Sequence, residues 1–140
     1  MNEDSGLKRF LDAQQHDYDR ALAEIQNGRK QSHWMWYIFP QIAGLGFSHM
    51  ARFYAIKDLT EATNYLHHPV LGNRLVEIAG ALLAIQGKTA LQIMGSPDDL
   101  KLHSSMTLFS LVEGADPVFQ NVLDMYYNGK PDPQTIERAT

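Results

Sequence analysis

Residues 69–86, PVLGNRLVEIAGALLAIQ, form the longest helix that the sequence predicts. Apolar side chains recur along this stretch at intervals of three and four residues, which places them on one helix face. They are Leu71, Leu75, Ile78, Ala79 and Leu82. Val76 and Leu83 widen the stripe, so we expect this helix to be buried at the centre of the core. His68, just before Pro69, is interpreted as its cap.

Helix start and stop signals continue on both sides of this segment. Proline suits the first helical position because its missing N–H would have no helical partner there. Three pairs of a capping residue and a proline therefore predict helix starts: Ser96-Pro97, Asp116-Pro117 and Asp132-Pro133. Asp58 and Glu61 have capping-box spacing, and Asn27-Gly28 predicts a helix end. Only Trp34–Phe39 has the pattern of a short strand. We expect an all-α fold, with one compact multi-helix domain over residues 1–140 and an ordered core over 7–136.

The composition excludes several classes of function. The chain has 140 residues, of which 44% are hydrophobic and 20% are charged, as in globular proteins. It has no cysteine, which excludes disulfides, zinc–thiolate sites and cysteine nucleophiles. Its net charge of −4 argues against general binding to nucleic acid or to anionic membranes. No stretch reaches about 18 apolar residues and no signal-peptide pattern opens the chain, so we expect a cytoplasmic protein.

The first segment that could carry chemistry is RKQSHWMWYIFPQ, residues 29–41. Aromatic faces can stack on a planar ring, and arginine or lysine can pair with phosphate. This interpretation assigns ligand contacts to Arg29, Lys30, Trp34, Trp36 and Gln41, and a catalytic role to His33. The alternative is that the aromatic side chains anchor the core and that His33 is an ordinary hydrogen-bonding partner.

The second segment is Gly44-Leu45-Gly46-Phe47-Ser48, which leads into a predicted helix ending near Tyr54. Gly44 and Gly46 would allow a ligand to approach the backbone closely, next to the N–H groups of the following helix. The alternative is a tight turn between two helices. The segment has neither the phosphate-loop pattern nor the dinucleotide-binding pattern, and we expect no cofactor.

The third segment is SPDDLKLHSSMTLF, residues 96–109. On a helix, Asp98, Lys101 and Ser105 share one face, and Ser104 and Thr107 lie on a neighbouring face. Hydroxyl side chains are locally unfavourable inside a helix, and such violations are expected at functional sites. The alternative is that the hydroxyls bond to the preceding turn and that Asp98 and Lys101 form a surface ion pair.

Arg74 lies in the first turns of the longest predicted helix. It is interpreted either as a phosphate clamp or as a partner of Glu77 or Glu61. His67 and His68 are adjacent and so point apart on a regular element, unlike the histidines of zinc-binding helices. No other metal-ligand spacing is present, and we expect no metal site.

Several of these strings together resemble the bacterial domain-of-unknown-function family numbered 1810, which is uncharacterised and sometimes labelled calpastatin-like. The strings are GRK…SHWMW…FPQ (28–41), GLG (44–46), YAI (54–56), HPVLGNRL (68–75) and DDLK…SSMTLF (98–109). The resemblance extends from about Leu7 to Ile136 and implies an all-helical domain with no established activity. A more distant resemblance is to the NADAR superfamily, which processes ADP-ribose-type substrates. It implies that Lys101 and Phe109 occupy the place of that family's buried lysine and aromatic residue.

Two hypotheses for the function follow. In the first, these segments form a site for a nucleotide or ADP-ribose-like molecule that carries phosphate. Arg29, Lys30, Arg74 and Lys101 would then contact the phosphates, and Trp34 or Trp36 would stack on the base. His33 or Asp98 would act as acid or base, and Ser104, Ser105 and Thr107 would orient the ligand or a water molecule. In the second hypothesis, the protein is a non-catalytic interaction or structural module, such as a homodimer. The residues identify no particular reaction.

Overall fold

The structure, a computed structural model, describes residues 6–140, and residues 1–5 of the predicted domain lie outside this range. Within that range the chain forms nine α-helices. They are α1 (Lys8–Gln26), α2 (Met35–Ile38), α3 (His49–Phe53), α4 (Leu59–His67), α5 (Leu71–Leu83), α6 (Ala90–Met94), α7 (Asp98–Ser110), α8 (Val118–Tyr126) and α9 (Pro133–Ala139). Between residues 6 and 140, β structure is limited to one isolated parallel bridge, from Ile42 to Ile56. The predicted all-α class is therefore confirmed.

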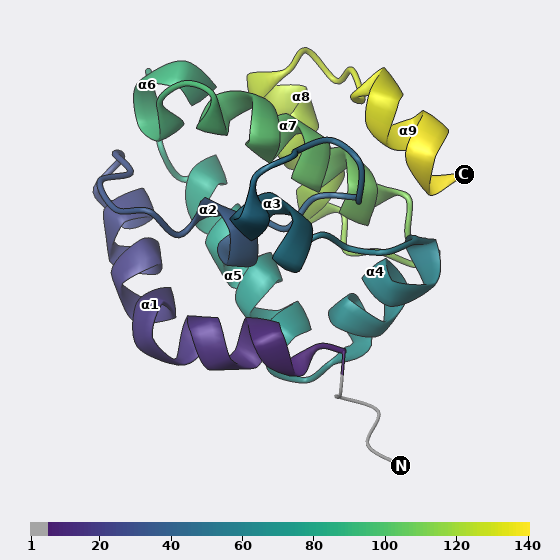
Figure 1. Cartoon of the computed structure of the whole chain (residues 1–140). Helices are drawn as coiled ribbons and strands as arrows, with labels where there is room; N and C mark the ends of the chain where they lie inside the picture. Colours follow the sequence, from purple (N-terminus) through teal and green to yellow (C-terminus); the bar gives the residue numbers. More distant parts are fainter. Residues whose placement is uncertain (1–5) are drawn as a thin grey trace.

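Helix α5 is the central buried helix that the apolar stripe predicted, although it spans 71–83 rather than 69–86. It packs against α1, α4 and α8, and α1 and α9 lie at opposite edges of the molecule (Figure 1). The chain turns sharply between α4 and α5, where a Cβ on Gly72 would lie 2.0 Å from the carbonyl oxygen of Leu66. Only glycine allows this approach, so the turn depends on that residue.

Helix α7 follows the predicted start at Ser96-Pro97, and it is a second buried helix, which the sequence did not predict. Its residues from Ser104 to Phe109 are all buried, and it packs against α4, α6, α8 and α9. Two of its hydroxyls bond to carbonyls of the preceding turn, Ser104 to Leu100 and Thr107 to His103. This pairing is the alternative that the sequence left open for these residues.

Two of the five predicted caps, Asp58 and Asp132, stand at helix starts, whereas Val70 and not His68 is the cap of α5. Asp132 precedes α9 with Pro133 in its first turn, and the Asp58 carboxylate accepts a hydrogen bond from the Glu61 amide. Helices α7 and α8 begin one residue later than predicted, because their prolines occupy the cap position.

Two short helices depart from the predictions. The strand pattern at Trp34–Phe39 does not correspond to a strand, because these residues form α2 and its caps. A short apolar run has the same composition in a buried strand and in a buried helical turn. Helix α6 was not predicted, although Thr89 and Gln92 form a capping box that marks its start.

Candidate functional site

The segment that follows α1 is held in place by one carboxylate. Glu24 accepts hydrogen bonds from the amides of Gln31 and Ser32, from the Ser32 hydroxyl and from the Trp34 indole, over 2.6 to 3.0 Å. Burial opposes ionisation of this carboxyl, but the four hydrogen bonds outweigh burial and lower its pKa from 4.5 to about 2. Sequence reasoning missed Glu24. The sequence feature that could have pointed to Glu24 is its position in the last turn of a helix, where the helix dipole disfavours a negative charge.

Three charged residues meet between this segment and the start of α7. The Lys30 ammonium lies 2.9 Å from Oδ2 of Asp98, and Lys101 Nζ lies 3.7 Å from Oδ1 of the same carboxylate. Lys30 also donates a hydrogen bond to the Ser32 carbonyl. Its side chain is only 6% exposed, so the charge of Asp98 is needed to stabilise a nearly buried cation.

Each lysine also lies over one of the two tryptophans. Lys30 Nζ is 4.7 Å from the ring centroid of Trp34, and Lys101 Nζ is 5.1 Å from that of Trp36. Trp34 is 1% exposed and belongs to the core, as the alternative reading of the aromatic residues proposed. Trp36 is only partly buried. Of the two tryptophans, Trp36 alone offers a ring surface to a ligand.

A pocket of about 360 Å³ opens beside Trp36, and we call it the Trp36 pocket. It brings together four of the predicted site residues, from segments far apart in the sequence: Lys30, His33, Trp36 and Asp98. Ser32 and Ser96 add hydroxyl groups to its wall, and Met35 and Met94 add apolar surface. The arrangement offers one aromatic face and several hydrogen-bonding groups to a small molecule.

A second pocket, of about 500 Å³, lies on the other side of Pro97, and we call it the Ser104 pocket. It contains another four predicted residues: Gln41, Gly46, Lys101 and Ser104. Gly44 does not line it. That glycine adopts a positive φ of 97°, and a Cβ there would lie 2.4 Å from the guanidinium of Arg138. Gly44 therefore forms a tight turn against α9, as the alternative reading proposed.

The buried hydroxyls of α7 differ in what they contact. Ser104 donates to the Asp132 carboxylate, and Thr107 accepts a hydrogen bond from the Asp132 amide at 2.9 Å. Both residues therefore fasten α7 to the start of α9. Ser105 is fully buried, and its hydroxyl has no hydrogen-bond partner among residues 6–140. Ser105 and Thr107 lie beneath the surface and line neither pocket.

Arg74 lies apart from the other predicted residues. Its guanidinium lies 5.1 Å from the ring centroid of Tyr18 and donates to the side-chain amide of Gln14, between α1 and α5. Its suggested partners are engaged elsewhere, since Glu77 accepts a hydrogen bond from Tyr18 and Glu61 pairs with Arg9. The structure does not bring Arg74 to either pocket.

Comparison with known proteins gives a family and no activity. A family model described as "Protein of unknown function (DUF1810)" matches residues 4–139. The fold is similar to the crystal structure of the conserved hypothetical protein Rv1873 from Mycobacterium tuberculosis, which is 46% identical, with 94% of each chain covered and a TM-score of 0.92. No curated protein matches the chain. These findings support the first resemblance seen in the sequence and give no support to the NADAR resemblance. Over residues 6–140, no helix has the length and apolar character needed to cross a bilayer.

Proposed function

The chain belongs to the DUF1810 family of proteins of unknown function, and from that premise we propose that it binds a small phosphate-bearing molecule of the nucleotide or ADP-ribose type. The ligand would lie in the Trp36 pocket. The observation that carries this proposal is that Trp36, Asp98 and Lys30, from segments far apart in the sequence, line one opening, with Lys101 lying over the Trp36 ring.

Each group in the pocket has a chemical role in this proposal. The exposed part of the Trp36 ring stacks on the planar base, an interaction worth about 1–3 kcal/mol. The carboxylate of Asp98 and the imidazole of His33 accept hydrogen bonds from the ligand, and either would serve as acid or base if a reaction occurs there. Lys30 contacts the phosphate nearest the base. Lys101, whose ammonium lies 5.1 Å from the centroid of the Trp36 ring, holds that ring in place for stacking.

A thermal-shift and tryptophan-fluorescence screen tests this proposal. The compounds are NAD, ADP-ribose, nucleotides and sugar phosphates. A ligand at 100 times its dissociation constant should stabilise the fold by about 2.7 kcal/mol. Lys101→Ala should weaken binding, whereas Lys57→Ala, which removes an exposed lysine that lines neither pocket, should not. Arg74→Ala should also leave the affinity unchanged. If no compound shifts the melting temperature at millimolar concentration, the proposal is wrong.

A second candidate function is a non-catalytic interaction module, and one observation favours it. Phe47 and Leu100, both at the Ser104 pocket, are 78% and 62% exposed. Exposed apolar side chains at one opening suit a protein contact, of which a homodimer is the simplest form. Light scattering on the purified chain tests this. A dimer that Phe47→Ser converts to a monomer would support the candidate, and a monomer at all concentrations would contradict the homodimer.

A further inference from the structure

A third pocket, of about 520 Å³, lies on the far side of Lys30, and we call it the Arg29 pocket. Its wall includes Arg29, Lys30 and Lys88, together with residues of α6 and the glycines before and after that helix. The Arg29 pocket and the Trp36 pocket share Lys30 and Met94. The two openings therefore adjoin each other at Lys30 and Met94, and a single elongated molecule could occupy both.

The charge of the Arg29 pocket differs from that of the protein. The chain carries 12 lysines and arginines against 16 acidic residues. In the described part of the chain, this pocket is nevertheless lined by three cations and by no aspartate or glutamate. Lys30 is already paired with Asp98. Arg29 and Lys88 therefore give the pocket its positive potential, which attracts anions.

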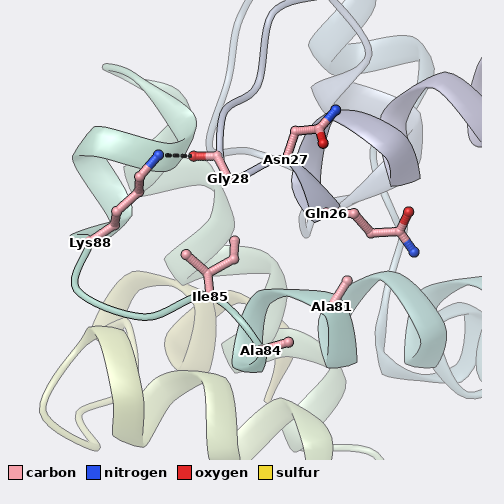
Figure 2. A pocket seen from close by; sticks show the side chains of 7 residues that line it. All are labelled: Gln26, Asn27, Gly28, Ala81, Ala84, Ile85 and Lys88. Atoms are coloured by element: carbon pink, nitrogen blue, oxygen red, sulfur yellow. Dashed lines mark hydrogen bonds between the residues drawn. The ribbon is translucent and has the colours of Figure 1, made fainter.

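A backbone contact holds Lys88 at Gly28, the residue before Arg29. The Lys88 ammonium donates to the carbonyl oxygen of Gly28 at 3.0 Å. Figure 2 shows this contact in a neighbouring pocket that Lys88 also lines. Gly28 has a positive φ of 79°, and a Cβ there would lie 3.0 Å from the Lys88 ammonium. This glycine, which follows the C-cap of α1, thus also makes room for the lysine. Arg29 follows Gly28 directly, and both cations line the Arg29 pocket.

We infer that the Arg29 pocket binds the terminal phosphate of a diphosphate, so that the ligand class is a nucleoside diphosphate rather than a nucleoside monophosphate. This inference rests on the proposed function, in which the planar ring lies on Trp36. A guanidinium offers a fork of N–H donors that fits phosphate oxygens, and the lysine adds a compact second charge. A monophosphate bound at Trp36 would reach Lys30 and leave Arg29 and Lys88 without a ligand contact.

Isothermal titration of ADP, AMP and pyrophosphate tests this inference. The wild-type protein should bind ADP at least about tenfold more tightly than AMP. The reason is that the second phosphate adds hydrogen bonds to charged side chains, which are strong enough for such a difference in affinity. Arg29→Gln and Lys88→Gln should each lower the ADP affinity about tenfold and leave the AMP affinity unchanged. Arg52→Gln and Lys57→Gln are matched controls, because both residues are exposed and line none of the three pockets. The preference for ADP should decrease as salt is added.

The outcomes separate this inference from the proposed function. If ADP and AMP bind equally, or if both Arg29 and Lys88 variants bind ADP like the wild type, the inference is overturned while the proposed function stands. If neither nucleotide binds and no other compound of the thermal-shift screen does, the proposed function fails. In that case, the protein could still bind pyrophosphate. If it does, and if both variants weaken this binding, the Arg29 pocket is an anion site. If it does not bind pyrophosphate, the anion site is overturned as well.

Discussion

Asp98 in the first turn of α7 lies 2.9 Å from the ammonium of Lys30 in the segment after α1. This ion pair joins the two walls of the Trp36 pocket, and the same carboxylate is also approached by Lys101 on the neighbouring turn of α7. Because Lys30 is nearly buried, the pair both organises the candidate site and contributes to the stability of the fold.

The first prediction concerns this pair. Asp98→Asn keeps the shape of the side chain but leaves the Lys30 ammonium without its counter-charge, and should destabilise the fold by about 2–3 kcal/mol. Lys101→Ala removes a cation that is 3.7 Å away and 26% exposed, so it should cost less than about 1 kcal/mol. Urea unfolding of both variants measures the difference. Equal effects would show that the Lys30–Asp98 pair has no special role.

The second prediction concerns pH. The pKa of Glu24 is lower in the folded state, about 2, than its ordinary value of 4.5. Its stabilisation is therefore fully present above about pH 4.5 and is lost as the pH falls toward 2. Glu24→Gln should be less stable than the wild type at neutral pH. The difference in free energy of unfolding between the two proteins should decrease as the pH falls from about 4.5 to about 2. Glu113→Gln, which changes an exposed acid, is the control. A gap that stays constant from pH 7 to pH 2 would contradict the role given to Glu24.

The fold could be predicted from the sequence where the signals are local. The apolar stripe of α5 and the caps at Asp58 and Asp132 depend only on neighbouring residues. The same reasoning failed at Trp34–Phe39, because the helical form of that run is set by its packing within the core.

The candidate site was predictable only in part. Residues such as Lys30, Trp36 and Asp98 were chosen for their chemistry, and their convergence depends on tertiary contacts that no local pattern encodes. Arg74 was chosen on the same grounds, yet the fold turns it toward Gln14 and Tyr18. Burial separates Trp34 from Trp36, although they are two residues apart in the sequence.

The third prediction compares two glycines of α5. Gly72→Ala should destabilise the fold by about 3 kcal/mol, because its Cβ would collide with the backbone of Leu66. Gly80→Ala should stabilise it by about 0.5–1 kcal/mol, because no atom lies within 4 Å of that Cβ and alanine favours a helix. Thermal unfolding of the two variants gives the comparison. Similar melting temperatures would contradict the close packing of α4 on α5.

The fourth prediction separates two buried hydroxyls of α7. Ser105→Ala removes a hydroxyl without a hydrogen-bond partner in the described chain, so stability should stay unchanged or rise by up to about 1 kcal/mol. Thr107→Val leaves the Asp132 amide without its acceptor and should cost about 1–2 kcal/mol. Both variants preserve the apolar packing closely. If Ser105→Ala were the more destabilising change, the assignment of these contacts would be wrong.

The central claim is that Trp36, and not Trp34, faces a bound ligand. The chain has only two tryptophans, so protein labelled with 5-fluorotryptophan should give two ¹⁹F resonances, which Trp36→Phe assigns. We predict that adding ADP shifts the Trp36 resonance and leaves that of buried Trp34 nearly unchanged, and that Lys101→Ala weakens this response. If the Trp36 resonance does not move at millimolar ADP, or if only the Trp34 resonance moves, the ring of Trp36 is not the binding surface for this class of ligand.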